Sequence, residues 1–274
     1  MRGYAWHLPI AQALTTLWQQ RALLKRLVWR EIVGRYRGAW LGLSWSVLTP
    51  LLMLVIYTFV FGVVFAPRVG AGGPGNHFDF ALSLFAGLIV FNLFAEVVTR
   101  APGLIVANPN YVKKVVFPLA LLPLAALLAA LFHAVVSLAI LAAALAVTGK
   151  LGLTTLWLPL VWMPFLLMTA GFAWALAALG VFWRDLTQVV GMLSTALLFL
   201  SPVFYPVSAL PPPIRPWLFM NPLTVPIEQT RAVLMLGQAP QWLELGVYGV
   251  IALVVAWAGL ALFERTRPGF ADVV

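Results

Sequence analysis

The stretch VFPLALLPLAALLAALFHAVVSLAILAAALAV, residues 116–147, decides the fold class of this chain. It contains no Asp, Glu, Lys or Arg, and it exceeds the length of about 20 predominantly apolar residues that a helix needs to cross a bilayer. A bilayer accepts such a segment because lipid replaces the apolar neighbours that a soluble core would have to supply. The segment therefore predicts an integral membrane protein.

The composition of the whole chain agrees with this prediction. Hydrophobic residues make up 63% of the 274 residues and charged residues only 9%, whereas soluble domains have about 45–50% and about 25%. The net charge of +9 predicts a basic face toward anionic membrane lipids. Nucleic acid is not expected as a partner, because no long basic domain is present. The absence of cysteine excludes disulfides and thiolate metal sites.

Six stretches are long and apolar enough to be spans, so an all-α integral membrane protein with six transmembrane helices is expected. The third and fourth are longer than a span needs, which predicts tilt or kinks near the prolines at their starts. The predicted spans are Leu41–Phe65, Phe80–Val98, Val116–Val147, Leu156–Phe182, Leu186–Tyr205 and Leu243–Phe263. Residues 41–263 are thus interpreted as the transmembrane domain.

Lys and Arg residues in the short loops predict the orientation. If both termini are cytoplasmic, 13 of the 17 basic residues lie inside, and the reverse topology places those 13 outside. The inside set is Arg2, Arg21, Lys25, Arg26, Arg30, Arg35, Arg37, Arg100, Lys113, Lys114, Arg184, Arg265 and Arg267. Residues 1–40 lack a signal-peptide pattern and are expected to be a cytoplasmic segment, as is the tail 264–274.

Residues 11–37 have apolar residues at spacings of three to four, which predicts an amphipathic helix at the inner membrane surface. Leu14, Leu17 and Trp18 begin the apolar side, while Arg21 and Lys25 reach headgroups or water. A simple electrostatic anchor is the alternative interpretation.

Two loops between the predicted spans are candidate functional segments. The segment 100–115 is cytoplasmic by the charge rule and is either a short helix that contacts a cytoplasmic partner or an ordinary basic loop. The segment 207–242 is rich in proline yet apolar, which predicts re-entrant helices between spans five and six, forming an outer gate. There Thr224 is expected to cap a helix Val225–Leu236, and Glu228 is expected to pair with Arg231.

Few residues within the spans can ionise. Glu96 is expected to pair with Arg100, four residues later on the same helix, and His133 is expected to pack or to form a hydrogen bond between helices. The chain has no phosphate-binding loop, no G-x-S-x-G and no H-E-x-x-H motif. The sequence therefore predicts a membrane passage without its own source of energy, and not an enzyme.

Four blocks occur together in a familiar order. They are REIVGRYRGAWLGLSWSVLTP at 30–50, NPNYVKKVVFP at 108–118, FWRD at 182–185, and the outer block with SPVFYP at 201–206, NPL at 221–223 and Glu228 with Arg231. With these blocks the chain resembles the membrane subunits of type-2 ABC exporters for polysaccharide or polyol phosphate, such as O-antigen, teichoic acid or capsule. The resemblance covers nearly the whole chain, and Pro109 is a departure that affects the shape of the 108–114 turn.

The resemblance implies a bacterial inner-membrane homodimer with two separate ATPase subunits, which bind ATP and Mg, and a lipid-linked glycan as cargo. It implies no cofactor in this chain. The implied inner gate and ATPase interface comprise Arg30, Glu31, Arg35, Tyr36, Arg37, Asn108, Asn110, Lys113, Lys114, Arg184 and Asp185. The implied translocation path comprises Trp45, Tyr57, Phe199, Phe204 and Tyr205, and the outer gate Asn221, Glu228 and Arg231. Packing against lipid or other helices is the alternative for each of these residues.

Arg30, Arg35 and Arg37 are expected near a diphosphate headgroup, because Arg binds phosphate through two parallel hydrogen bonds. An exporter of a drug or small lipid remains an alternative within the same class. A membrane-bound glycosyl- or phosphotransferase is an alternative of another class, but it needs an acidic metal motif that the sequence does not show. A channel or scaffold is permitted by the re-entrant segment but is not suggested by the 108–118 block.

Overall fold

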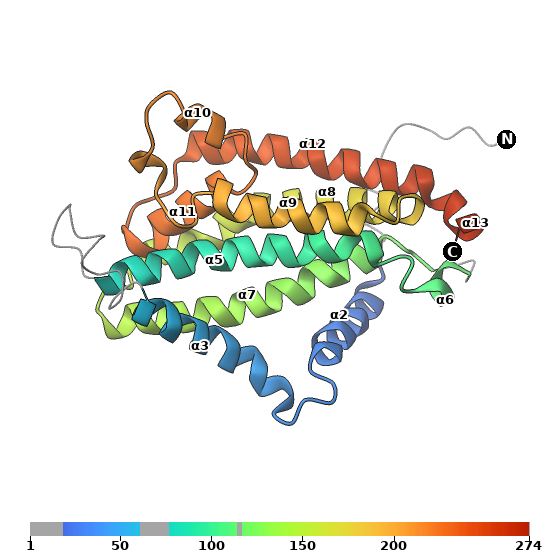
Figure 1. Cartoon of the computed structure of the whole chain (residues 1–274), viewed down its shortest axis with the longest axis horizontal. Coiled ribbons are helices and arrows are strands. Elements are labelled where there is room, and N and C mark those ends of the chain that lie inside the picture. The colour runs from blue at the N-terminus through green and yellow to red at the C-terminus, as the bar shows by residue number, and fades with distance from the viewer. Residues whose placement is uncertain (1–18, 61–76, 114–116, 274) are drawn as a thin grey trace.

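The chain forms a bundle of long helices that lie side by side along its longest axis (Figure 1). The computed structural model describes residues 19–60, 77–113 and 117–273, and within these ranges the chain is helical without β-strands. The predicted all-α class is therefore confirmed for the described residues.

Five of the described helical segments are long and apolar enough to cross a membrane. They contain α3 (Trp45–Phe59, preceded by η1, Gly42–Ser44), α5 (His77–Arg100, followed by η3, Ala101–Gly103), α7 (Leu121–Val147), α8 (Leu158–Phe182, preceded by η4, Leu153–Trp157) and α12 (Trp242–Thr266, followed by η6, Arg267–Gly269, and α13, Phe270–Val273). These helices correspond to predicted spans one to four and six.

The fifth predicted span, Leu186–Tyr205, is too long at its C-terminal end. Helix α9 (Leu186–Leu200) has 15 residues, and Ser201 leaves the helix in an extended conformation. The next residue is Pro202, whose ring disfavours helical geometry in the residue before it. At about 1.5 Å per residue, α9 is shorter than the hydrocarbon core of about 30 Å.

Helix boundaries depart from the prediction mainly at the helix starts. The linker before α3 turns at Gly38 (φ 87°) and Gly42 (φ 50°), a backbone region that favours glycine, so Leu41 precedes the span instead of starting it. Pro118 likewise remains outside α7. Pro164 is retained inside α8, which continues to Phe182 as predicted.

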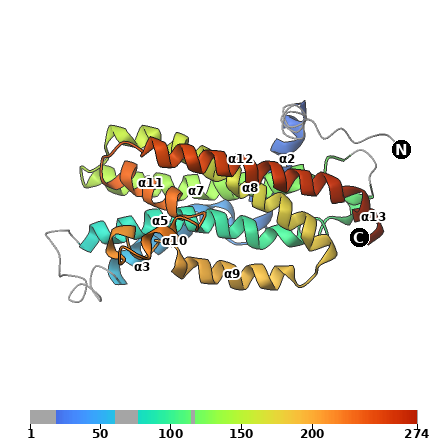
Figure 2. The ribbon, with the colours of Figure 1, turned by 90° about the horizontal axis from the view of Figure 1, so that it is seen from above.

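Helix α5 forms the centre of the bundle, with α7, α8, α9 and α11 (Thr224–Met235) around it (Figures 1 and 2). In its most apolar window 78% of the residues are buried, against 11% in α3. Helix α8 packs along α12 at close range, because Gly171 and Gly259 have no side chain. A Cβ built on Gly259 would lie 2.1 Å from the Gly171 carbonyl oxygen. The core is thus built around α5 and the α8–α12 pair.

Helix α2 (Arg21–Arg35) and α3 form a V whose apex points away from α5 and α7 (Figure 1). Leu27 and Ile32 of α2 are buried, and Leu27 packs against Leu121 and Ala125 of α7. The described part of the predicted amphipathic helix therefore turns apolar side chains toward protein. Residues 11–18 of that prediction lie outside the described residues.

The segment 207–242 contains η5 (Val207–Ala209), α10 (Arg215–Leu218) and α11. Helix α11 is mostly buried against α5 and α8, whereas most residues around α10 are exposed. The re-entrant arrangement of this segment stays a prediction. The predicted cap at Thr224 is wrong, because Thr224 is the first residue of α11 and its hydroxyl donates to the Leu218 carbonyl oxygen at 2.6 Å. The cap position is Leu223, which has no side-chain oxygen to offer.

The two ends of the bundle carry different elements. We call basal the end where α6 (Pro109–Val112), α13 and the last described residues lie (Figure 1). The opposite end carries η4, α10 and α11. The segment 100–115, predicted to be a partner-contacting helix or a basic loop, contains η3 and α6 at the basal end, with Lys114 and Val115 outside the described residues.

Candidate functional site

A cavity of about 1020 Å³ lies between α2, α3, α5 and α7. One part of its wall is apolar, with Met53, Phe85, Leu88, Ile89 and Leu93. Another part is polar and ionisable, with Arg30, Glu31, Arg35, Tyr36, Asn92, Glu96, Thr99, Arg100, His133 and Ser137. The cavity therefore offers both an apolar and a polar wall, as an amphipathic ligand requires.

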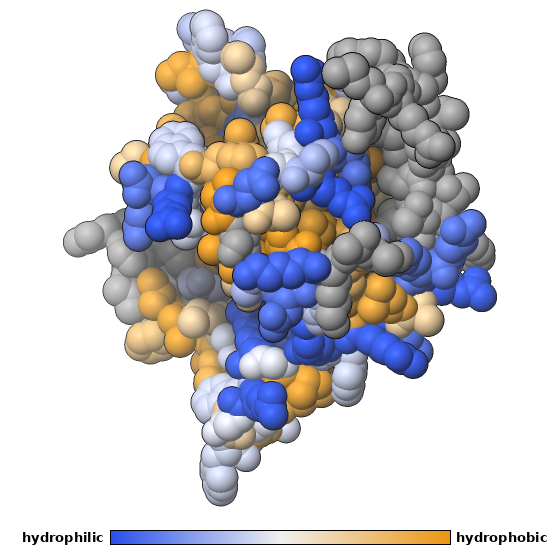
Figure 3. Space-filling model, turned by 90° about the vertical axis from the view of Figure 1, so that its right-hand side faces the viewer, coloured by the Kyte–Doolittle hydropathy of each residue, from blue (hydrophilic) through white to orange (hydrophobic). Residues whose placement is uncertain are grey.

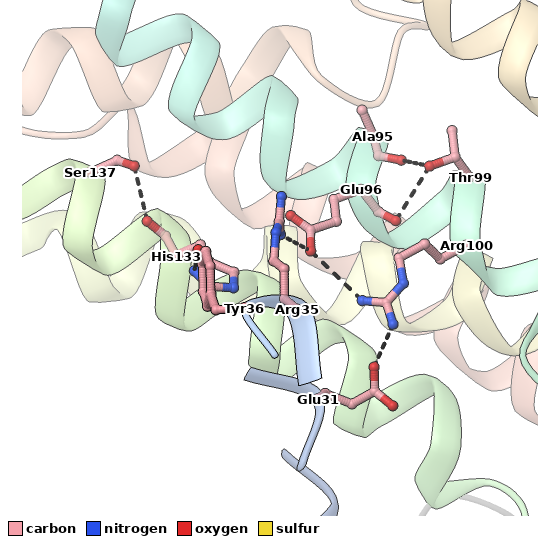
Figure 4. A network of polar contacts seen from close by, with 9 residues as sticks. All are labelled: Glu31, Arg35, Tyr36, Ala95, Glu96, Thr99, Arg100, His133 and Ser137. Carbon is pink, nitrogen blue, oxygen red and sulfur yellow. Dashed lines mark hydrogen bonds and ion pairs between the residues drawn. The ribbon is translucent and has the colours of Figure 1, made fainter. Parts of the chain in front are cut away.

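The charged groups form an alternating chain across this cavity. Arg35 Nη1 donates to Glu96 Oε1 at 2.6 Å, and Arg100 Nη1 lies 3.8 Å from the same carboxylate oxygen. Arg100 also pairs with Glu31 (Figure 4). The other oxygen of Glu31 is 3.5 Å from Arg30 Nη2. The expected pair of Glu96 with Arg100 is confirmed, but Glu96 lies closer to Arg35.

In these cavity ion pairs the arginines are more exposed than the acids. The side chains of Arg35 and Arg100 are 48% and 40% exposed, whereas those of Glu96 and Glu31 are 20% and 19% exposed. Burial opposes the charge of Arg35, but the hydrogen bond and the negative charge of Glu96 outweigh it and raise the pKa of Arg35. The accessible rim of the cavity is therefore positively charged.

A tyrosine–histidine contact holds the end of α2 against α7. The Tyr36 hydroxyl and His133 Nδ1 lie 3.4 Å apart, within hydrogen-bond distance, and the two rings meet edge to face. Burial raises the pKa of the Tyr36 hydroxyl, against the opposing charge of Arg35, so Tyr36 stays protonated at neutral pH. The prediction that His133 makes a contact between helices is confirmed.

A second set of contacts connects α2 with α6. Arg30 Nη1 donates to the Tyr111 hydroxyl at 2.6 Å, and its guanidinium carbon lies 5.4 Å from the centre of the Tyr111 ring. Tyr111 stacks on Phe117 with ring centres 4.3 Å apart. Arg267 Nη2, after α12, donates to the Phe117 carbonyl oxygen at 3.1 Å. The cavity wall is thus linked through α6 to the C-terminal segment.

Some of the predicted ATPase interface residues lie at the basal end, in α6 and in the turn between α8 and α9. Asn108 is the cap residue of α6, and Pro109 occupies its first position, where the missing N–H costs no hydrogen bond. Asn110 and Lys113 are exposed, as are Arg184 and Asp185 in the turn between α8 and α9. Hydrophilic side chains cover much of the visible part of this face (Figure 3). Arg37 is exposed beyond α2 and does not line the cavity.

The predicted path aromatics fall into separate groups. Tyr57 lines the cavity, whereas Trp45, also on α3, does not. Phe199 and Phe204 stack with ring centres 5.8 Å apart at the C-terminal end of α9, where the Tyr205 hydroxyl donates to the Phe199 carbonyl oxygen at 3.2 Å. Of the five residues, only Tyr57 lines the cavity.

The predicted outer gate residues meet around the end of α9. The Asn221 amide donates to the Ser201 hydroxyl oxygen at 2.9 Å. Arg231 pairs with Glu228 at 3.3 Å, as predicted, and its guanidinium also donates to the carbonyl oxygens of Pro202 and Val203. Arg231 is only 8% exposed. The structure therefore brings these three residues together from separate parts of the outer block.

The fold and these groupings agree with the comparisons to known proteins. The family model for ABC-2 type transporters matches residues 22–235. The chain belongs to the ABC-2 type transporter family. That match includes α2 from its second residue onward, the other three helices that line the cavity, and α11.

Similar curated proteins extend the likeness over most of this ABC-2 chain. An O-antigen export system permease protein of Myxococcus xanthus is 29% identical, covering 94% of this chain and 97% of the relative. An O-antigen export system permease protein of Klebsiella pneumoniae is 25% identical, with coverages of 89% and 92%. A polysialic acid transport protein of Escherichia coli is 27% identical, with coverages of 90% and 94%.

Sequence reasoning missed part of the cavity of this ABC-2 chain. Glu96 and Arg100 were assigned only to each other, and Tyr111 was not assigned a contact with α2. The available signal was the presence of ionisable residues within or beside an apolar span, which is rare without a function. Within the described ranges, no three His, Asp or Glu side chains gather as a metal site requires.

Proposed function

We propose that this chain is the permease subunit of an ATP-driven exporter that moves lipid-linked polysaccharide across the bacterial cytoplasmic membrane. The observation that carries the proposal is the cavity, with its cationic rim beside an apolar wall. A lipid-linked glycan presents matching groups, namely an anionic phosphate linkage next to a hydrocarbon tail. The names of the relatives, which refer to O-antigen export and polysialic acid transport, support the same cargo class.

The proposed headgroup site uses Arg35 and Arg100. Both guanidinium groups face the cavity and are about half exposed, so a phosphate oxygen can approach them. Arg30 also lines the cavity but donates to Tyr111. Arg37, which the sequence predicts near the headgroup, does not line the cavity, whereas Arg100 does.

The driving force is proposed to come from two copies of a separate ATPase that binds ATP and Mg. Its contact surface is the basal end, with α6 and the turn between α8 and α9. Exposed basic groups there, such as Lys113 and Arg184, suit an acidic or polar partner surface. The contact between Tyr111 and Arg30 joins α6 to the cavity wall, and so offers a physical route from partner to cargo.

The full subunit is proposed to cross the membrane six times, with both termini cytoplasmic, and to work as a homodimer. Helix α9 is proposed as the fifth crossing along the chain, in addition to the five longer helices, with the segment after Ser201 completing its depth. Much of α3 and α9 is exposed, including Leu52 and Val55 of α3 and Met192 and Phe199 of α9. These apolar faces are available to lipid and to the second copy.

The test is transport by the chain reconstituted in vesicles with the ATPase that co-purifies with it. Arg35→Gln is expected to lower ATP-dependent movement of a prenyl-diphosphate-linked glycan about tenfold, as expected for a lost charge-assisted hydrogen bond. Arg215→Gln is the matched control, because Arg215 lies at the opposite end and binds backbone carbonyls.

Three outcomes would contradict the proposal. They are glycan movement without ATPase, the absence of any ATPase that binds the chain, and equal transport by Arg35→Gln and wild type. Transport of small amphiphiles instead of glycan would support the drug or small-lipid exporter.

A further inference from the structure

The two arginines of the proposed headgroup site already have anionic partners. Glu96 lies between them, at 2.6 Å from Arg35 Nη1 and 3.8 Å from Arg100 Nη1. A second acid, Glu31, pairs with Arg100 from α2. The carboxylates therefore occupy the positions that phosphate oxygens would take on the same guanidinium groups.

We propose that Glu96 is an internal substitute for the anionic headgroup and that a diphosphate group displaces it from Arg35 and Arg100. This inference rests on the proposed function and adds a form of regulation at the same site. In the empty cavity Glu96 satisfies the cations and holds α2 against α5. In the occupied cavity the headgroup takes over the cations, and the link from α2 to α5 through Glu96 opens.

The geometry favours displacement over permanent pairing. The two guanidinium groups are about half exposed, so the pairs gain little from a low dielectric and are weak enough to exchange. A multiply charged diphosphate attracts both cations more strongly than one carboxylate does. The cavity volume of about 1020 Å³ leaves room for such a group beside the acids.

The exchange has a direct connection to α6. Arg35, at the end of α2, releases Glu96, while Arg30, on the same helix, donates to Tyr111 of α6 at 2.6 Å. A shift of α2 on headgroup binding therefore reaches the segment proposed to contact the ATPase. Cavity occupancy and ATPase rate are linked through α2.

The experiment separates an internal substitute from a purely structural ion pair, because the two predict opposite changes in headgroup affinity when Glu96 is replaced. If Glu96 only holds the site together, Glu96→Gln weakens headgroup binding. If Glu96 competes with the headgroup, Glu96→Gln tightens binding by about fivefold or more, since one nearby negative charge is removed. The measurement is the Kd of farnesyl diphosphate for the purified complex with its ATPase.

Inorganic pyrophosphate is the second probe, because it carries the diphosphate without a lipid tail. Glu96 competes with the diphosphate, which both probes carry. Glu96→Gln is therefore expected to increase the affinity for both probes by the same factor. Tightening of farnesyl diphosphate alone would overturn the proposal. The apolar wall is expected to make farnesyl diphosphate the tighter ligand in wild type and variant alike.

Glu264→Gln is the matched control, because Glu264 pairs with Arg267 at 3.3 Å outside the cavity. The affinity of this variant for farnesyl diphosphate is expected to equal that of wild type. Glu31→Gln provides a second variant in case Glu96→Gln does not fold, and it is also expected to tighten binding. The ATPase rate of Glu96→Gln without ligand is expected to approach the ligand-stimulated rate of wild type.

The outcomes distinguish this inference from the proposed function. If wild type binds farnesyl diphosphate, Arg35→Gln weakens it, and both Glu→Gln variants bind equally or more weakly than wild type, the internal substitute is overturned and the headgroup site stands. If wild type binds neither probe, the headgroup site falls and this inference falls with it.

Discussion

Arg231 shows at the scale of one residue how a cation is accommodated inside an apolar bundle. Among the described residues, it is the one charged residue that is buried. Its guanidinium donates to carbonyl oxygens of Ser83 in α5, at 3.1 Å, and of Pro202 and Val203 after α9. Pro202 and Val203 follow the end of α9, where carbonyl oxygens have no helical N–H partner, so the cation supplies the missing donors for these two.

Arg231→Met is expected to destabilise the fold by about 3 kcal/mol or more, because it leaves buried carbonyls unsatisfied. Arg215→Met is the control, since Arg215 also donates to backbone carbonyls but is only partly buried. The measurement is the thermal unfolding midpoint of the detergent-purified chain. Similar midpoints for the two variants would contradict a structural role for Arg231.

At the same scale, sequence spacing identified only contacts within one turn. The Glu228–Arg231 pair was predicted from a spacing of three residues, and the Glu96–Arg100 pair from a spacing of four. The pair of Arg35 with Glu96 joins residues 61 positions apart. No local pattern encodes that distance, because it depends on how α2 packs against α5 and α7.

At the scale of helices, close approach of α8 and α12 depends on the absence of side chains. Cβ atoms built on Gly171 or Gly259 would overlap the backbone of the facing helix. Small residues at helix contacts are common in membranes, where van der Waals packing replaces the hydrophobic effect as the main attraction between helices. The α8–α12 contact is therefore expected to be intolerant of added volume.

Gly259→Ala is expected to destabilise the chain by about 1–3 kcal/mol, since the added methyl must push backbone atoms apart. Gly246→Ala, on the same helix, is the matched control, because its Cβ would meet nothing within 4 Å. Alanine there is expected to be neutral or to stabilise the helix by about 0.5–1 kcal/mol. Equal expression and melting of both variants would show that the two helices are looser than described.

Helix type and approximate position could be predicted from the sequence, whereas helix ends could not. The apolar runs predicted α5, α7, α8 and α12 to within a few residues, because hydropathy acts locally. Helix α9 ends early because Pro202 follows it, although the apolar run continues past this proline. The Thr224 cap failed because the chain turned one residue earlier and offered the Leu218 carbonyl to the hydroxyl.

At the scale of the whole molecule, the bundle has two chemically different ends. The basal end carries exposed cations such as Lys113 and Arg184, and the opposite end carries the apolar and proline-rich segment around α10. In a membrane this asymmetry favours a cytoplasmic basal end. If α9 crosses the membrane, the turn before it and the segment after it lie on opposite sides of the bilayer.

Single cysteines provide a topology test without background, because the chain has none. Lys113→Cys and Asp185→Cys are expected to react with an impermeant maleimide only from the cytoplasmic side. Leu151→Cys and Ser208→Cys are expected to react only from the opposite side. Labelling of positions 185 and 208 from the same side would contradict a crossing by α9.

The membrane class, the main helices and the side of the membrane expected for the basic loops can all be derived from the sequence, since each depends on composition within a short window. The partners of the arginines emerge only from the packed helices: Arg35 meets Glu96, Arg30 meets Tyr111, and Arg231 meets the end of α9. Hydropathy along a chain specifies where a helix is stable. The partners of a polar side chain depend on the packing of helices distant in sequence, which hydropathy does not contain.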